Sequence, residues 1–181
     1  MSEEQEARSF DSRPDTYEHI GKVRANLSKV IRSLLHRAEV HDQSKLKEPE
    51  VSVFNEYTPK LAESTYGSDE YKSFLEGMKA GLDHHYAEND HHPEHFIDGS
   101  APFSYFGDSE PASRFAREPL TGIQAMDLVQ LIEMLCDWQA ATQRHKDGDI
   151  RRSIEQNQER FGYGDELKQI LLNSVEAVSD E

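Results

Sequence analysis

The sequence has one cysteine, Cys136, so it cannot form an internal disulfide, and it lacks an apolar run long enough to cross a bilayer. Its first residues, MSEEQEARSFDSRPD, have neither the basic start nor the apolar stretch of a signal peptide. Basic residues are scarce, 20 Lys and Arg against 35 Asp and Glu, and the formal charge of −15 opposes binding along the phosphate backbone of DNA or RNA. We therefore expect a cytoplasmic protein that binds neither a membrane nor long nucleic acid.

Alternation of apolar and polar residues, the pattern of half-buried strands, is nearly absent, and apolar residues instead recur at helical spacing. This pattern predicts an all-α protein. The length of 181 residues suits one helical domain, 15–178, behind a flexible acidic N-terminus, 1–14. The expected helices span about 15–40, 68–89, 121–146, 149–160 and 165–178, with another helical stretch that begins near Pro49 and is broken or restarted at Pro59.

Two of these helices have recognisable start signals. Ser68 is a typical N-cap residue, and Thr121 is followed three residues later by Gln124, the spacing of a capping box. Between the two helices, Asp90 to Leu120 carries four prolines, two glycines and four phenylalanines without a sustained period. We expect a long loop rich in His, Pro and Phe, and loops of this length are often functional.

Five of the nine histidines lie in one short stretch, LDHHYAENDHHPEHF, residues 82–96. They are His84, His85, His91, His92 and His95. Histidine is the commonest protein ligand of borderline divalent metals, so this density, with carboxylates interleaved, predicts a metal site. The apolar stripe of the preceding helix continues at His85 and not at His84, which puts His85 on the buried face. The alternative is an exposed pH-sensitive loop or an adventitious nickel binder.

A second candidate group is the dipeptide His41-Asp42, followed by Ser44 and Lys45. A carboxylate beside an imidazole suits Fe, Mn, Co, Ni or Zn better than Ca. Asp42 alone is equally well explained as a helix cap, and Lys45 as a solvated side chain. If the site handles phosphate, Lys45 is a candidate contact for it.

The third group lies in the stretch EMLCDWQAA, where Glu133 and Asp137 interrupt an apolar helix. Together with Gln130 and Arg144 they fall within a sector of about 60° at 100° per residue. Such a sector is either a solvated stripe or the lining of an internal polar site. The His-Asp pair and the histidine stretch favour the second interpretation.

His-Asp, then further histidines, then a distant aspartate, all in a helical chain, resembles the ligand order of the HD superfamily of metal-dependent phosphohydrolases. His41-Asp42 is similar to the defining dyad, Lys45 to the lysine three residues after it in many members, and Asp137 to the closing aspartate. The paired histidines with the following Asp98-Gly99 resemble the histidine tract of the HD-GYP subfamily, but the Gly-Tyr-Pro is missing.

A closer resemblance is to a family of small uncharacterised bacterial and phage proteins. The shared strings are HDxSK, YGSxEY, HHPEHF and EMxCDW, and the likeness runs from His19 to about Asn173. That family brings no established reaction. An HD-like bundle with a metal site is what the two resemblances imply.

The resemblance implies His41, Asp42 and Asp137 as ligands of one divalent transition-metal ion (Mn, Fe, Co, Ni or Zn). It adds His19 as a further ligand, although one uninterrupted helix would put His19 about 33 Å from His41 at 1.5 Å per residue. His19 reaches the site only if the chain turns back near Asn26 to Lys29. A second ion would be held by the histidine stretch, with Asp42 bridging the two ions, and the expected ligands there are His85, His91 and His92. We expect His95 to be structural or to support a ligand.

These assignments favour a metal-dependent phosphohydrolase acting on a small phosphorylated molecule, a nucleotide above all. Lys45 and Glu133 are the expected catalytic residues, with Glu133 orienting water or holding a ligand. Substrate contacts are expected from Arg37, Asn89 and Arg144, with Phe103, Tyr105 and Phe106 shaping the pocket. Two alternatives stay open: an HD-fold diiron oxygenase, and a non-catalytic, metal-stabilised helical binding protein. A homo-oligomer is compatible with each.

Overall fold

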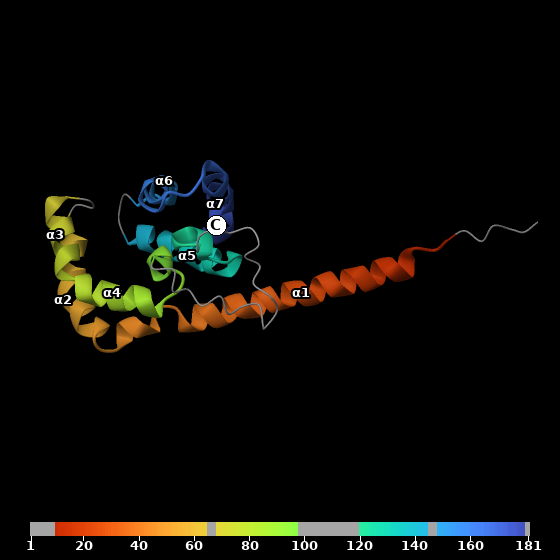
Figure 1. The fold of residues 1–181 in the computed structure, drawn as a ribbon, viewed down its shortest axis with the longest axis horizontal. Coiled ribbons are helices and arrows are strands. Elements are labelled where there is room, and N and C mark those ends of the chain that lie inside the picture. The colour runs from red at the N-terminus through yellow and green to blue at the C-terminus, as the bar shows by residue number, and fades with distance from the viewer. Residues whose placement is uncertain (1–9, 65–67, 98–119, 145–147, 180–181) are drawn as a thin grey trace, which may run out of the picture. The chain divides into compact units, whose positions relative to one another are not determined.

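The computed structural model describes residues 10–64, 68–97, 120–144 and 148–179. Every regular element in these ranges is a helix, which confirms the all-α prediction. The α-helices are α1 (Arg13–Val40), α2 (Glu50–Glu63), α3 (Asp69–Gly77), α4 (Lys79–Glu88), α5 (Leu128–Gln143), α6 (Ile150–Phe161) and α7 (Asp165–Val178), and the short 3-10 turns are η1 (Gln43–Leu46), η2 (Pro93–Phe96) and η3 (Gly122–Ala125) (Figure 1). Within the described ranges, none of these helices combines the length and apolarity needed to span a membrane.

The chain divides into two units, residues 1–39 and 40–181. The described part of the first unit is essentially the single helix α1. It begins two residues before the predicted start, ends at the predicted Val40, and continues without interruption through residues 26–29. One helix cannot bury its own apolar stripe, so the core of the protein lies in the second unit.

The second unit starts with η1 and α2, against which α3 and α4 pack (Figure 1). Two predictions here were wrong. Pro59 lies inside α2 without breaking it, and the helix continues to Glu63. Because Pro59 lacks the N–H that would bond back to the carbonyl of Asn55, its cost falls on the turn before it. The helix predicted over 68–89 is two helices that meet at Met78, directly after Gly77, a residue that weakens helices. Ser68 caps α3 as predicted, accepting from the backbone N–H of Tyr71.

A glycine on each of these two helices lets it approach α2 closely. A β-carbon at Gly77 would collide with the ring of Tyr57, and one at Gly81 would collide with Val53. The same tight packing buries Met78 to 2 % exposure. It also fixes the position of α4, which carries His85.

The remaining elements of the second unit, α5, α6 and α7, pack around one apolar core (Figure 1). Its buried members are Phe96, Ile123, Met126, Met134, Leu135, Trp138, Ile150, Ile154, Tyr163, Leu171 and Val175. Phe96 belongs to η2 and Ile123 to η3, so the histidine stretch is anchored to this core. α7 has the predicted bounds, and α6 begins after the cap residue Asp149.

The start of α5 differs from the prediction. Thr121 to Gln124 is no capping box, because Gly122 adopts a left-handed backbone (φ 55°) that an α-helix cannot include, and a 3-10 turn forms instead. The capping box is built by Asp127 and Gln130, and α5 ends at Gln143 instead of near residue 146. Most of the predicted loop, residues 98–119 with Phe103, Tyr105 and Phe106, lies outside the described residues.

Candidate metal centre

Asp42 occupies the sharp turn between α1 and η1. Its backbone is left-handed (φ 56°, ψ 17°), a conformation that Asp tolerates better than most residues, and its side chain makes no capping hydrogen bond. Asp42 therefore does not act as a side-chain helix cap, the alternative that its sequence position allowed. The turn instead directs the carboxylate of Asp42 toward the histidine stretch.

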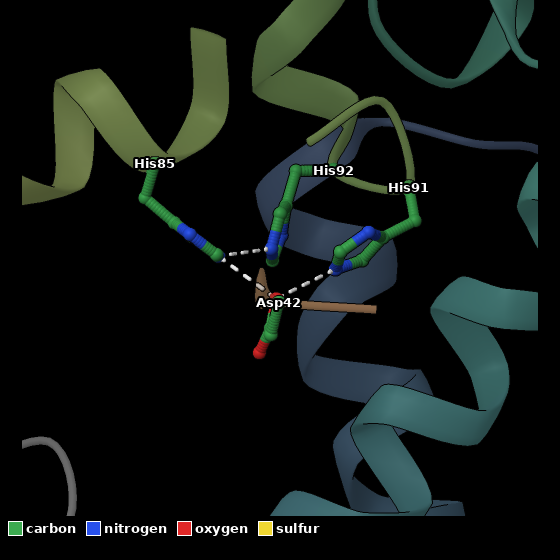
Figure 2. A group of neighbouring side chains, drawn as sticks. All are labelled: Asp42, His85, His91 and His92. Carbon is green, nitrogen blue, oxygen red and sulfur yellow. Dashed lines mark hydrogen bonds and ion pairs between the residues drawn. The ribbon is translucent and has the colours of Figure 1, made fainter. Parts of the chain in front are cut away.

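Three histidines gather beside Asp42, two of them against its Oδ1 atom and the third against His85 (Figure 2). His85 comes from α4, and His91 and His92 from the segment that follows it. The Nε2 atoms of His85 and His91 lie 3.4 and 3.5 Å from Asp42 Oδ1, and the Nε2 atoms of His85 and His92 lie 2.9 Å apart. We call these four residues the histidine group.

The other oxygen of Asp42 faces a second set of ligands. His41 Nε2 lies 3.5 Å from Asp42 Oδ2 and 3.8 Å from Asp137 Oδ1 on α5. We call His41, Asp42 and Asp137 the His-Asp group; its candidate ligand atoms all lie within 4.8 Å of one another. Asp42 thus belongs to both groups, and the His-Asp pair, the histidine stretch and Asp137 meet in one place.

Burial keeps the three imidazoles of the histidine group neutral. Desolvation lowers the pKa values of His85 and His91, and it lowers the pKa of His92 to about 3. A neutral imidazole has a lone pair available for a metal, whereas a protonated one has none. Near neutral pH, these three side chains are therefore in the form that coordination requires.

The carboxylates of the centre are ionised. Burial opposes the charge on Asp137, but the ion pair with His41 and the nearby ammonium group of Lys45 bring its pKa to about 2. Burial likewise opposes the charge on Asp42, and the ammonium group of Lys45 holds the pKa of Asp42 below its ordinary value. Asp137 and then Glu133 raise the pKa of His41 to about 10, so a metal at the His-Asp group would have to displace a proton.

Two buried atoms of the histidine group, Asp42 Oδ1 and His91 Nε2, lack a hydrogen-bond partner among the described residues. A buried polar atom without a partner is costly, and here an anionic oxygen and a nitrogen lone pair face the same space. A cation between them would satisfy both. The imidazole and carboxylate donors fit a borderline divalent ion such as Mn, Fe, Co, Ni or Zn.

The opposite ring nitrogens of the histidines are held by two glutamates. Glu133 Oε1 lies 2.8 Å from His41 Nδ1 and 3.3 Å from His91 Nδ1, while Glu50 Oε2 lies 2.9 Å from His85 Nδ1. A carboxylate at Nδ1 favours a proton there and leaves Nε2 free to bind. Of the two predicted roles for Glu133, the geometry agrees with holding ligands. Glu50 was not predicted, because a Glu after Pro49 is an ordinary first-turn residue.

Lys45 and Asn89 both support ligands. Lys45 Nζ donates to Asp42 Oδ2 at 2.6 Å, and the amide of Asn89 donates to Ser44 Oγ and to the carbonyl oxygen of His85, both at 2.8 Å. Both amide hydrogens of Asn89, which was predicted to contact substrate, are therefore used in hydrogen bonds within the protein. His95 Nδ1 lies 2.9 Å from the carbonyl oxygen of Tyr86, in line with the structural alternative predicted for it.

The remaining predicted residues are two substrate contacts, Arg37 and Arg144, and one metal ligand, His19. Arg144 is the exposed C-cap of α5, and Arg37 lies in the last turn of α1. His19 lies near the start of α1, and about 32 Å of unbroken helix separates it from Val40 at 1.5 Å per residue. His19 could be a ligand only if the chain turned back near residues 26–29, and that segment is continuous helix.

Fold and site together define an all-α protein whose histidines and aspartates meet around one shared carboxylate. By comparison with family models, the chain belongs to the family of unknown function DUF5662, whose model matches residues 8–180. Neither the curated proteins nor the solved structures yielded a match to this chain.

Proposed function

We propose that this protein is a metal-dependent phosphohydrolase that acts on a small phosphorylated molecule, a nucleotide above all. The observation that carries the proposal is the position of Asp42, whose two oxygens face different ligand sets, Oδ1 the histidine group and Oδ2 His41. One carboxylate shared by two adjacent sets suits a pair of ions. The resemblance of His41-Asp42, Lys45 and Asp137 to the HD phosphohydrolases points the same way.

The chain's own residues have separate tasks in this proposal. The histidine group and the His-Asp group hold one ion each and share Asp42, and Glu133 keeps His41 and His91 oriented toward them. Bound divalent ions would lower the pKa of a water and offset the charge of the phosphoryl oxygens. Lys45 donates one hydrogen bond to Asp42 and lies over the ring of Phe54, and among the described residues its ammonium group makes no other hydrogen bond, so it can also donate to a phosphate oxygen.

The charge of the protein limits the substrate. A formal charge of −15 repels a long phosphate backbone, whereas a compact phosphate needs only the ions and a few cationic side chains. We therefore propose a small substrate in the cytoplasm, with neither a membrane nor long nucleic acid as a partner.

The test is phosphate release by metal-loaded protein. Metal-free protein is incubated with Mn, Fe, Co, Ni or Zn in turn and with nucleoside mono-, di- and triphosphates, and free phosphate and pyrophosphate are measured. Release that depends on the metal and disappears in Asp42→Asn supports the proposal. A fully loaded protein that hydrolyses none of these esters contradicts it.

The composition of the histidine group favours a second candidate. Three imidazoles and one carboxylate include the two-histidine, one-carboxylate set of non-haem iron oxygenases. A diiron oxygenase would consume O₂ with an organic substrate and release no phosphate, so an oxygen electrode separates the two enzymes. A protein that holds its metal without turning over either kind of substrate would be the non-catalytic binding protein.

A further inference from the structure

Glu50 is a fully buried carboxylate, 0 % exposed, at the first residue of α2. Its Oε1 lies 2.7 Å from His84 Nδ1, and its Oε2 lies 2.9 Å from His85 Nδ1 and accepts from Ser44 Oγ at 3.0 Å. Among the described residues, no lysine or arginine pairs with it. Burying a charge in this way is costly unless something compensates it, so the position calls for a functional explanation.

The contact with His85 decides which ring nitrogen carries the proton. The amide nitrogen of Asn89 lies 3.0 Å from His85 Nδ1, but its two hydrogens go to closer acceptors, Ser44 Oγ and the carbonyl oxygen of His85, both at 2.8 Å. Ser44 Oγ, 3.4 Å from the same ring nitrogen, donates its own hydrogen to Glu50 Oε2. The Nδ1 proton of His85 is therefore left to Glu50 Oε2. Nε2, on the other side of the ring, then presents its lone pair to Asp42 Oδ1 at 3.4 Å, inside the histidine group (Figure 2).

We infer that Glu50 is a positioning residue for the histidine group: its carboxylate fixes His85 in the tautomer that binds metal and supplies negative charge that offsets the ion. This inference rests on the metal centre of the proposed function. Glu133 provides the comparison, because it contacts His41 and His91, one histidine from each ligand set. Glu50 contacts only one ligand, His85, so its influence is confined to the histidine group.

The substitution Glu50→Gln tests this selectivity. Glutamine has nearly the same size but no charge, and its amide can offer an oxygen to only one of the two histidines. The metal-free full-length chain is titrated with Co²⁺ by calorimetry, and the visible absorption of the bound cobalt is recorded at each step. No substrate is needed, so the result is independent of any phosphatase activity.

We expect two Co²⁺ ions in the parent protein. In Glu50→Gln one ion should bind unchanged, while the other binds roughly 10–100-fold more weakly, the usual effect of losing an outer partner of a ligand histidine, and with an altered spectrum. Glu133→Gln should weaken both ions. Glu56→Gln is the matched control, since it makes the same change at an exposed position of the same helix, and it should bind like the parent.

Equal affinities and spectra in Glu50→Gln and the parent would overturn the role of Glu50 and leave the proposed function intact. Equal weakening of both ions in Glu50→Gln would overturn it too, since a general loss of structure would act on both groups. If Glu50→Gln does not fold, Glu50→Asp keeps the charge and withdraws the carboxylate by about 1.5 Å, one C–C bond, so the same selective loss is expected. A parent protein that binds no Co²⁺ would overturn the proposed function and this inference together.

Discussion

Replacing Asp137 by Asn should remove one ion from the centre without unfolding the chain. The Asp137 side chain lies on α5 with 22 % exposure, and its pKa of about 2, against 3.8 ordinarily, means that the folded protein favours its carboxylate by about 2 kcal/mol. The metal-free protein should lose stability of this order at neutral pH. Domains with typical stabilities of about 5–15 kcal/mol survive such a loss.

The effect on the metal should be larger. Asparagine keeps the shape of the side chain but loses the anionic oxygen that faces His41 Nε2 at 3.8 Å. Outer partners of ligands typically contribute about 10–100-fold to metal affinity, so the loss of a direct ligand should exceed 100-fold for the ion at the His-Asp group. The ion at the histidine group keeps its four ligands and should bind within a few-fold of the parent.

The assay is elemental analysis of dialysed protein together with thermal unfolding of the metal-free form. Asp127→Asn is the matched control, because it changes the N-cap of the same helix to a residue that caps equally well, away from both ligand groups. A folded Asp137→Asn protein that retains the full metal content of the parent would refute the assignment of Asp137 as a ligand.

Three further predictions concern removal of the metal, the side chain of Lys45 and the buried phenol of Tyr163. Stripping the metal with a chelator should lower the unfolding temperature by roughly 5–11 °C when the ion had been present at 100 times its Kd, because such binding adds about 2.7 kcal/mol to stability; an unchanged midpoint would argue against any ion bound to the folded state. Lys45→Ala should slow phosphate release while the ion at the histidine group stays bound, since Lys45 donates to Asp42 Oδ2 and the histidine group faces Oδ1; loss of that ion as well would make Lys45 a support for the ligand alone. Burial raises the pKa of Tyr163 to about 12, and the protonated phenol donates a hydrogen bond to the carbonyl oxygen of Ile154. The stability that the protonated phenol contributes is therefore complete below pH 10 and is lost as the pH rises toward 12. Tyr163→Phe should therefore be about 0.5–1.5 kcal/mol less stable at neutral pH and less sensitive to alkali, which urea unfolding at pH 7 and pH 11 can check.

The sequence predicted the helices where the local signals were unambiguous. α7 has its predicted bounds and Ser68 caps α3, because acidic first turns and N-cap residues act within a few positions. The break at Met78 was missed, because the apolar spacing continues across it while the packing of Gly77 against Tyr57 is a tertiary contact. The true capping box at Asp127 was missed because a second, equally good spacing began at Thr121.

The candidate site shows the same limit. The spacing of the apolar stripe was enough to select His85 over His84, and His85 is the buried one of the two at 1 % exposure. The sequence could not reveal Glu50, because its role depends on α2 and α4 lying side by side, which brings residues 34 and 35 positions apart within hydrogen-bond distance. His19 is the opposite case, a residue that the sequence suggested and the structure does not support. The order of ligands in the HD superfamily suggested it, but α1 is continuous and has no turn that would return His19 toward His41.

The most direct test of a metal centre shared through Asp42 is anomalous diffraction from crystals of protein loaded with Co²⁺ or Zn²⁺. Two peaks roughly 3.5–4 Å apart are expected, each within ligand distance of Asp42. One should be bounded by His85, His91 and His92, and the other by His41 and Asp137. No peak at Asp42, or metal only on exposed histidines, would contradict the shared centre.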